Sequence, residues 1–401
     1  MSTALEDIFQ RVLTARVFKD REKLRPDYVP EELPHREYEI KRLGETLAPA
    51  IKGVRPSNVF IYGLPGTGKT AVAKYVLKKL SKAAARLDLG SGLANCYINC
   101  KYDNTSYRVF ASLCEQLGVK VPFTGLSIPE LFRRFMKALE SSSRLVIIVL
   151  DEIDVLAGHS SSDLLYRLTR INSELSKSRV ALVGVTNDLK FTESLDPRVK
   201  SALGEEELVF KPYDSDELED ILRQRAKLAF MEGALEEGVI PLCATLAARE
   251  HGDARRALDL LRVAGEVAER GGGFKVTEAH VRKAQKELER DRVVEVLRSM
   301  PLHGKLTLMA VYLLERKGVK EKTTGEIYSL YKEVCKMLRL DELTQRRVSD
   351  LINELDVAGL VTARVVSRGR RGLTKIVKLN INEEILREGL REDDRLSALL
   401  Q

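Results

Sequence analysis

The sequence has no tryptophan, few cysteines and no long apolar run. No stretch approaches the roughly 18 uncharged apolar residues that a membrane-spanning helix needs. Residues 1–25 are charged throughout and lack the apolar core of a secretory signal. We therefore expect an intracellular, cytoplasmic protein with no membrane partner.

The five cysteines do not indicate a disulfide framework, because an odd number inside a cell argues against one. Cys96 and Cys100 are close in sequence, but no pair of His or Cys residues near them has zinc spacing. Buried free thiols are the expected state.

The rest of the composition is that of a globular protein with a basic excess. The 401 residues are 44% apolar and 31% charged, and the net charge is +7. This length suits two or three domains. The positive charge favours an anionic partner but does not identify it.

Alternating strand-like and helix-like segments predict an α/β core, with a parallel sheet covered by helices on both faces. The strand-like runs are Val59–Tyr62, Cys96–Asn99, Leu145–Leu150, Val180–Val185 and Glu207–Phe210. Before this core, residues 1–40 form a charged lead-in, in which a short helix (Leu5, Ile8, Phe9, Val12, Leu13) precedes prolines that disfavour helix.

Two helical regions follow the core. The first is an all-helical domain without strand pattern, with predicted helices at Asp216–Ala229, Pro241–Glu250, Ala254–Arg270 and Thr277–Leu297. The second has helices at Lys305–Arg316, Thr324–Leu338 and Thr344–Ala358, followed by two strand-like runs around a glycine-rich turn at 367–372. Three helices and such a hairpin predict a winged helix-turn-helix domain. The predicted domains are residues 1–212, 213–292 and 293–401.

A phosphate-binding loop is the most specific motif. The pattern Gly-x4-Gly-Lys-Thr lies between an apolar strand and a helix, where backbone N–H groups and the helix dipole stabilise a polyanion. We expect Lys69 to reach the β- and γ-phosphates and the Thr70 hydroxyl to bind Mg²⁺. The predicted nucleotide-binding residues here are Gly63, Pro65, Gly66, Thr67, Gly68, Lys69, Thr70 and Ala71.

Two carboxylates, at positions 151 and 152, directly follow an apolar run. Asp151 is placed to hold Mg²⁺ through its water shell, and Glu152 to orient or deprotonate the attacking water. The other interpretation is a pair of N-capping acids for the segment that follows. With the phosphate loop, the pair predicts a site for ATP or ADP with Mg²⁺, and a capacity for hydrolysis.

Three further polar residues have two interpretations each. Asn187, at the tip of the next strand, either contacts the γ-phosphate or the water, or is a turn residue. Arg198 and Arg255 lie at the edges of elements, where surface salt bridges are the expected interpretation unless further motifs assign them a catalytic role.

The C-terminal hairpin is strongly basic, because residues 360–379 contain six cations and no acid. Arg and Lys contacts to phosphates supply most non-specific DNA affinity, and a wing arginine can enter a minor groove. The third helix would present polar residues to the major groove, above a buried stripe of Val348, Leu351, Ile352 and Leu355. The predicted DNA-binding residues are Gln345, Arg346, Arg347, Ser349, Arg364, Arg368, Arg370, Arg371 and Lys375. The alternative is a winged helix that contacts protein.

The order of these motifs resembles the AAA+ ATPases and, more narrowly, the archaeal replication initiators of the origin-recognition and cell-division-control type. The resemblance covers nearly the whole chain. Its further motifs are Tyr28-Val29-Pro30-Glu31-Glu32-Leu33-Pro34-His35-Arg36-Glu37, Asn99-Cys100-Lys101, Thr105-Ser106-Tyr107, Thr124-Gly125-Leu126-Ser127, Phe210-Lys211-Pro212-Tyr213 and Gly252-Asp253-Ala254-Arg255-Arg256-Ala257-Leu258-Asp259.

The resemblance implies a role for each matching residue. Asn187 would be sensor 1, Arg255 would be sensor 2 contacting the γ-phosphate in cis, and Arg198 would be an arginine finger acting on a neighbour's ATP. Tyr28, Val29 and Pro30 would flank the adenine, and Tyr213 would belong to the same nucleotide site. Residues 101–137 would be an insertion that touches duplex DNA, although composition alone predicts an ordinary pair of amphipathic helices there.

We therefore expect an AAA+ replication initiator, monomeric in solution and assembling on duplex origin DNA, in which slow ATP hydrolysis acts as a switch. The family implies a replicative helicase and initiator paralogues as further partners. Two alternatives stay open at this point. One is a signalling or regulatory ATPase whose winged helix contacts protein, and the other is an ATPase of the clamp-loader kind.

Overall fold

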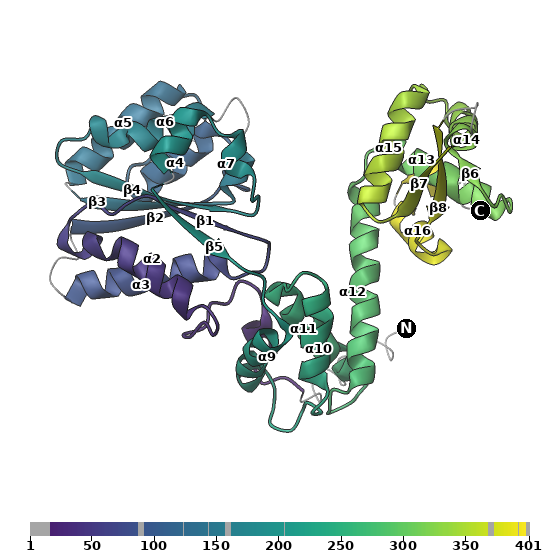
Figure 1. The fold of residues 1–401 in the computed structure, drawn as a ribbon, viewed down its shortest axis with the longest axis horizontal. Helices are drawn as coiled ribbons and strands as arrows, with labels where there is room; N and C mark the ends of the chain where they lie inside the picture. The colour runs from purple at the N-terminus through teal and green to yellow at the C-terminus, as the bar shows by residue number, and fades with distance from the viewer. Residues whose placement is uncertain are drawn as a thin grey trace. The chain divides into compact units, whose positions relative to one another are not determined.

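The structure, a computed structural model, forms two compact bodies, Met1–Arg282 and Lys283–Gln401, which are considered separately (Figure 1). The described residues are 17–86, 92–122, 124–142, 144–156, 162–203, 205–367, 373–391 and 393–397. The helix predicted around Leu5 to Leu13 lies outside them. The first body contains both the α/β core and the helical region after it, and the division into three domains stays a prediction.

The core sheet is parallel, as the sequence predicted, and its five strands lie in the order β2-β3-β4-β1-β5. The strands are β1 (Val59–Gly63), β2 (Leu93–Asn99), β3 (Leu145–Asp151), β4 (Arg179–Thr186) and β5 (Glu206–Phe210). The strand β2 begins three residues before its predicted start. It is an edge strand, so its first residues are only half-buried and do not form an apolar run.

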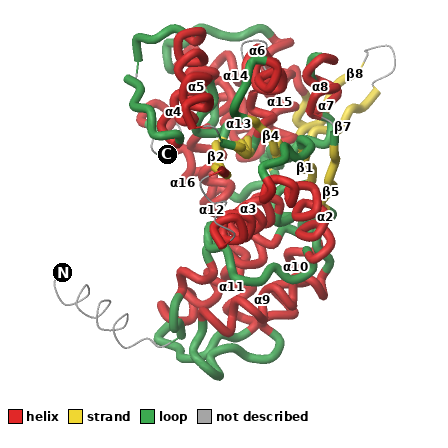
Figure 2. The backbone as a smooth tube through the Cα atoms, turned by 90° about the vertical axis from the view of Figure 1, so that its left-hand side faces the viewer, coloured by secondary structure: helices red, strands yellow, loops and turns green. Residues whose placement is uncertain are grey.

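Helices cover both faces of the sheet because successive side chains of each strand point to opposite faces. Phe60 and Tyr62 pack on one side with α4 (Ser106–Gln116), α5 (Ile128–Ser142) and α6 (Ser162–Arg170). Val59 and Ile61 pack on the other with α2 (Glu37–Leu47) and α3 (Lys69–Arg86). Figures 1 and 2 show the two helical layers with the sheet between them.

Short helices complete the core along the chain. They are η1 (Arg21–Leu24), η2 (Ala48–Lys52), η4 (Ile153–Leu156), η5 (Ile171–Ser173), α7 (Phe191–Ser194) and α8 (Pro197–Leu203). In the sheet register, Asn99 of β2 lies beside Asp151 of β3. The ends of the parallel strands therefore bring polar residues from separate segments to one edge.

The helical lid follows β5 and consists of α9 (Ser215–Ala229), α10 (Val239–Arg249) and α11 (Ala254–Arg270). Asp214 caps α9 in a reciprocal capping box with Glu217. The N-terminal segment runs along this lid, where Lys19 N donates to the Ala229 carbonyl at 2.8 Å and the Phe18 and Phe230 rings lie 4.7 Å apart. Sequence patterns did not predict this contact.

The second body is a winged helix. The chain enters it along α12 (Glu278–Ser299), and its elements are α13 (Leu302–Arg316), β6 (Lys322–Thr323), α14 (Thr324–Met337), α15 (Gln345–Val357), β7 (Val361–Ser367), β8 (Leu373–Leu379), α16 (Glu383–Leu390) and α17 (Asp394–Ser397). The sheet order is β6-β8-β7, and β7 and β8 form the predicted antiparallel hairpin. The sequence prediction missed β6, which is too short to show alternation, and the two C-terminal helices. Within the part of the chain that the structure describes, no helix is long and apolar enough to cross a membrane.

Candidate functional site

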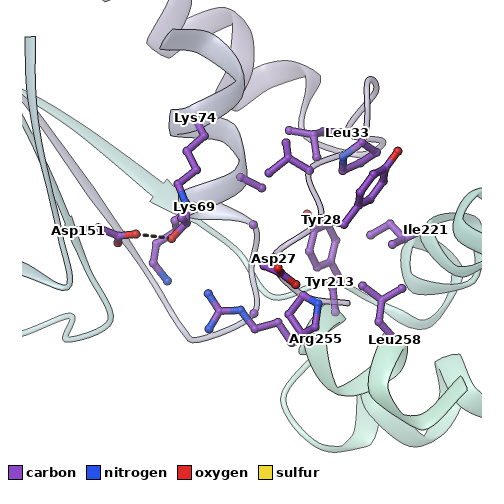
Figure 3. Close-up of a pocket in the computed structure, with 18 of the residues that line it drawn as sticks. Asp27, Tyr28, Leu33, Lys69, Lys74, Asp151, Tyr213, Ile221, Arg255 and Leu258 are labelled. Atoms are coloured by element: carbon purple, nitrogen blue, oxygen red, sulfur yellow. Dashed lines mark hydrogen bonds between the residues drawn. The ribbon is translucent and has the colours of Figure 1, made fainter. Parts of the chain in front are cut away.

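A cavity of about 600 Å³ in the first body collects most of the predicted nucleotide-binding residues (Figure 3). Its wall combines the N-terminal segment, the phosphate loop, the ends of the core strands and the lid. The predicted residues that line it are Gly66, Gly68, Lys69, Thr70, Ala71, Tyr28, Val29, Pro30, Tyr213, Asp151, Glu152, Asn187 and Arg255.

Three predicted loop residues do not line the cavity, and two of them help to hold the loop in shape. The Gly63 carbonyl accepts a hydrogen bond from Lys69 Nζ at 2.8 Å. The buried Thr67 hydroxyl donates to the Leu64 carbonyl at 2.9 Å. Pro65 is exposed. The loop is therefore held in shape by its own side chains.

Lys69 stands at the first turn of α3 and is only 5% exposed. Its ammonium group donates to the carbonyls of Gly63 and Leu64. Burial, together with the nearby positive charge of Arg255, lowers the pKa of Lys69 to about 8. The ammonium group donates to carbonyl oxygens, and carboxylates of the site attract it. A phosphate in the cavity would add a negatively charged hydrogen-bond partner.

The lid contacts the phosphate loop directly at Gly66. Ala254 N donates to the Gly66 carbonyl at 3.2 Å, and a Cβ atom at position 66 would lie 1.7 Å from Asp253 Oδ1. Gly66 also has a φ of +74°, which L side chains rarely adopt. Only glycine allows this contact between lid and core.

Asp151 is buried at the end of β3 and holds two hydroxyl groups on one carboxylate oxygen. Its Oδ2 accepts from the Thr70 hydroxyl at 2.8 Å and from the Tyr97 hydroxyl at 2.5 Å, and its Oδ1 accepts from Glu152 N at 3.0 Å. Burial and the bond to Asp151 raise the pKa of Tyr97, so that this hydroxyl stays a donor. The predicted metal residues, Thr70 and Asp151, are thus adjacent.

The donor set suits magnesium, which binds proteins through one or two carboxylates, hydroxyl groups, phosphate and water rather than through a full protein cage. The described residues contain no group of three or more His, Cys, Asp or Glu side chains that could hold a metal by themselves. Thr70 and Asp151 would hold the ion between the loop and the strand end.

Glu152 has a left-handed backbone, with a φ of 54°, which is strained for a residue with a side chain. Glu152 and Asn187 both line the cavity. Asp154 holds this edge together, since it accepts from the Thr186 hydroxyl at 2.8 Å and from Asn187 N at 3.4 Å. Asn187 therefore lies in a bend that Asp154 holds, and it also lines the cavity, so its contact with the γ-phosphate or the water stays a prediction.

The two predicted arginines occupy different places. Arg255 stands at the N-terminal turn of α11 and reaches from the lid toward Lys69 and Asp151 (Figure 3). Arg198 on α8 is not among the cavity's lining residues. It is exposed, bonded twice to Asp196 at 2.7 and 3.0 Å, and stacked over Tyr166. The bonds to Arg198 lower the pKa of Asp196 to about 2.

Sequence reasoning missed a buried arginine that joins the loop to the sheet. Arg36 is 4% exposed and donates to the carbonyls of Thr67 and Lys211 at 2.9 and 2.8 Å, while its guanidinium lies 3.7 Å from the centre of the Tyr213 ring. Burial raises the pKa of Tyr213 to about 12, so the phenol stays neutral. Nothing in the spacing around Arg36 indicated these partners. Tyr97 was missed for the same reason.

A second missed arginine secures the N-terminal segment to the lid. Arg225 of α9 is 4% exposed, donates to the Tyr28 carbonyl at 2.9 Å, and lies 4.7 Å from the centre of the Tyr28 ring. Burial lowers its pKa to about 10. The segment that the resemblance assigns to the adenine is therefore held in place by a lid helix.

Some of the predicted DNA-binding residues of the winged helix are exposed, and others are bonded to neighbouring side chains. Gln345, Arg346 and Arg364 are exposed. Arg347 is paired with Glu354 at 2.9 Å. Lys375 Nζ donates to Asn353 Oδ1 at 2.6 Å and to the Ser349 hydroxyl at 3.2 Å, which joins β8 to α15. The buried stripe of α15 is confirmed at Val348, Leu351, Ile352 and Leu355. Arg368, Arg370 and Arg371 lie outside the described residues.

The region 101–137 contains two helices that pack on the sheet. Phe110 of α4 and Phe135 of α5 are fully buried, with ring centres 5.9 Å apart. Arg133 and Arg134 are both paired with Glu130, whereas Lys101, Lys120 and Lys137 are exposed. The amphipathic helix pair is present, and a contact with DNA stays a prediction.

Models of known families match three successive parts of the chain. Residues 54–191 match an AAA domain, residues 219–286 a Cdc6 AAA+ ATPase-type lid domain, and residues 295–389 the CDC6 C-terminal winged helix domain. The chain thus has an AAA+ ATPase domain followed by a lid and a winged helix, as the sequence predicted.

Known relatives match over the full length. The chain is 54% identical to the ORC1-type DNA replication protein 1 of Sulfurisphaera tokodaii, with 100% of this chain and 99% of that protein covered. It is 51% identical to the ORC1-type DNA replication protein of Thermococcus kodakarensis, with 99% and 96% covered. Its structure is similar to that of the Aeropyrum pernix ORC1 protein in complex with DNA, with 53% identity, a TM-score of 0.86, and 96% and 99% of the chains covered.

Proposed function

This chain belongs to the ORC1-type family of DNA replication proteins, and from that premise we propose that it is a replication initiator that binds duplex origin DNA under the control of ATP. The family membership supports the role in replication. The residues of the cavity support the binding of a nucleotide, and the exposed cations of the winged helix support the binding of DNA.

The observation that carries the nucleotide switch is the meeting of lid and core around one cavity. Lys69 and Thr70 come from the core, Arg255 comes from the lid, and the lid also contacts the loop through Asp253 and Ala254. A nucleotide bound between them would contact both parts. Loss of its terminal phosphate would remove the group that Arg255 faces, and so would change how the lid is held.

Hydrolysis follows from the same arrangement. A bound Mg²⁺ would neutralise charge on the phosphates. Glu152 would orient or deprotonate the attacking water, Asn187 would hold that water or the γ-phosphate, and Lys69 and Arg255 would stabilise negative charge. Arg198 lies outside the cavity, so its proposed action is on the ATP of a neighbouring copy. Tyr28, Val29, Pro30 and Tyr213 would enclose the base. We expect slow turnover, suited to a switch.

DNA binding is proposed for the winged helix, with the region 101–137 as a second contact. Gln345 and Arg346 at the start of α15 would face the major groove, and the hairpin would lie along the minor groove with Arg364 and the turn arginines near phosphates. The A. pernix ORC1 protein, which shares 53% identity, is described in complex with DNA. By family, the other partners proposed are a replicative helicase and initiator paralogues, with the monomer assembling on DNA.

The test is nuclease footprinting of the purified protein on genomic DNA from its own source, with ADP and ATP compared. A protected site of defined sequence that changes with the nucleotide would support both parts of the proposal. A signalling ATPase with a protein-binding winged helix would give no specific footprint. An identical footprint with ADP, ATP and no nucleotide would refute the switch while leaving the DNA binding intact.

A further inference from the structure

An amide side chain outside the cavity holds the edge strand of the core sheet at the tyrosine that bonds Asp151. We propose that this residue, Gln116 at the end of α4, is a positioning residue for the magnesium site and acts through Tyr97. The inference rests on the proposed site for a nucleotide with Mg²⁺, and names a residue on which the metal affinity of that site depends. Gln116 does not line the cavity, so its effect on the metal must pass through another side chain.

The first step is the contact between Gln116 and the backbone of β2. Gln116 Oε1 accepts a hydrogen bond from Tyr97 N at 2.9 Å, and Gln116 Nε2 donates to the Tyr97 carbonyl at 3.0 Å. Because β2 is an edge strand, no other strand of the described sheet pairs with these two outward groups. The amide therefore takes the place of a further strand at this residue, and it fixes the position of Tyr97 at the edge of the sheet.

The second step is the contact between Tyr97 and Asp151. Asn99 lies beside Asp151 in the register, and Tyr97 stands two residues before Asn99, so both side chains of β2 point to the same face of the sheet. The Tyr97 hydroxyl donates to Asp151 Oδ2 at 2.5 Å, a distance typical of a hydrogen bond to a charged carboxylate. A displacement of Tyr97 would lengthen this bond and loosen the carboxylate that would hold Mg²⁺ together with Thr70.

The other contacts of Tyr97 lie within the nucleotide site. Its ring packs on the side of the core that contains α3, and Lys74 Nζ lies 4.4 Å from the ring centre. Lys74 and Asp151 both line the cavity, so a bound nucleotide can change both of these contacts. Gln116 holds the tyrosine from outside the cavity, whatever the cavity contains. It therefore orients Asp151 before the metal binds, as a supporting residue of a metal site does.

The chain contains a second amide contact of the same kind, which serves as a matched control. Asn172 Oδ1 accepts from Val180 N, and Asn172 Nδ2 donates to the Val180 carbonyl, both at 2.8 Å. Val180 is paired with Val146 of β3, at the opposite end of that strand from Asp151. Loss of this contact should loosen the sheet without moving the carboxylate of the metal site.

The test measures equilibrium binding of ADP at increasing Mg²⁺ concentration, so that hydrolysis plays no part. Gln116→Met removes both hydrogen bonds at similar side-chain length. We expect the Mg²⁺ concentration that half-saturates ADP binding to rise roughly threefold to tenfold, with the ADP affinity in the absence of Mg²⁺ unchanged. The rise should be smaller than in Tyr97→Phe, because ring packing still holds the tyrosine in part. Asn172→Leu, which removes the control contact, should leave both quantities unchanged.

A double variant decides whether Gln116 acts through the Tyr97 hydroxyl. That hydroxyl is absent in Tyr97→Phe, so Gln116→Met added to this variant should cause no further shift in Mg²⁺ dependence. A full additional shift in the double variant would overturn the inference. No shift in Gln116→Met alone, or an equal shift in Asn172→Leu, would overturn it as well.

A second substitution keeps the test decisive if circular dichroism shows that Gln116→Met does not fold. Gln116→Glu keeps the acceptor for Tyr97 N and loses only the donor to the Tyr97 carbonyl, and it should raise the half-saturating Mg²⁺ concentration in the same direction. An unchanged concentration in this variant would overturn the inference. Absence of Mg²⁺-dependent nucleotide binding in the wild type would instead refute the proposed site itself.

Discussion

The nucleotide cavity and the winged helix use their charged side chains in opposite ways. At the cavity and directly behind its loop, Lys69 and Arg36 are at most 5% exposed and bonded to backbone carbonyls, and Asp151 accepts from two hydroxyls. On the winged helix, Arg346 and Arg364 are exposed. The first site is assembled from segments far apart in the chain, and the second from residues 344–379.

This difference has an energetic consequence. A buried polar group that loses its partner costs the full desolvation penalty, so changes in the cavity should be large and interdependent. Exposed cations act through long-range attraction to phosphates, and their contributions should be small, additive and dependent on salt. The four predictions below test this contrast, from the largest expected effect to the smallest.

The largest effect is expected for Glu152→Gln, which keeps the shape of the side chain but removes its basicity. If Glu152 acts on the attacking water, turnover should fall about 10²- to 10⁴-fold, while ATP affinity stays within a factor of about two. Steady-state phosphate release and equilibrium nucleotide binding measure the two quantities. Unchanged turnover would contradict the role, and a parallel loss of binding would indicate a structural effect of the strained backbone instead.

The next effect concerns Tyr97, which we regard as a positioning residue for Asp151. Tyr97→Phe removes the hydroxyl that holds the carboxylate at 2.5 Å. Loss of such a supporting hydrogen bond typically weakens a metal site about 10- to 100-fold. The Mg²⁺ concentration that half-saturates ADP binding should rise accordingly, with ADP affinity in the absence of Mg²⁺ unchanged.

Tyr107→Phe is the control for this experiment, because the Tyr107 hydroxyl bonds the Pro122 carbonyl and does not line the cavity. A shift in Mg²⁺ dependence of equal size in both variants would assign the effect to general loosening rather than to Asp151. No shift in Tyr97→Phe would show that Thr70 and the ion orient Asp151 without help.

A smaller effect should appear in the stability of the two bodies at alkaline pH. Burial raises the pKa of Cys96 and Cys114 to about 11 and of Cys243 to about 12, and it also raises the pKa of Cys100. The folded state therefore holds these protons more tightly than the unfolded state. The corresponding stability is complete below pH 9 and is lost as pH rises toward 11.

At pH 10 the loss should be about 1 kcal/mol for each of these four thiols of the first body. The first body has four of the five cysteines and the second has only Cys335. Urea denaturation followed by circular dichroism should therefore show a larger fall in the free energy of unfolding of the first body between pH 8 and 10. Cys243→Ala should reduce the pH dependence of the first body, and Cys335→Ala that of the second only. An equal loss in both bodies would contradict the prediction.

The smallest individual effects are expected on the winged helix. Arg346→Ala and Arg364→Ala should each reduce the slope of log K against log salt concentration for duplex DNA by about 0.9, and the double variant by about twice that. Affinity at a given moderate salt concentration should fall only about threefold for each. Lys286→Ala, an exposed cation on α12, is the control. An unchanged slope in the double variant would remove both arginines from the interface.

The sequence was most informative where the physics is local. The parallel sheet, the lid helices and the winged helix follow from apolar periodicity and capping residues, and α11 has the predicted limits, Ala254–Arg270. The errors lie where these signals are weak. The edge strand β2 begins earlier than its apolar run, and β6 has two residues.

For the site, sequence spacing was sufficient to predict that Lys69, Thr70 and Asp151 meet. The loop motif and an acid at the end of a strand have a fixed spatial relation in this kind of sheet. Sequence spacing was insufficient for Arg36, Tyr97, Gln116 and Arg225. Their partners are remote in sequence, and no periodicity records which side chains meet.

By itself, the sequence determined the phosphate loop, the class of fold and the basic hairpin, since each depends on backbone geometry or charge within one short segment. Only the tertiary structure decided that Asp253 of the lid sits against Gly66, that Tyr97 bonds Asp151, and that Arg225 bonds the Tyr28 carbonyl. Those pairings arise from the packing of separate segments, and a buried polar atom acquires its role only when burial removes water as its partner.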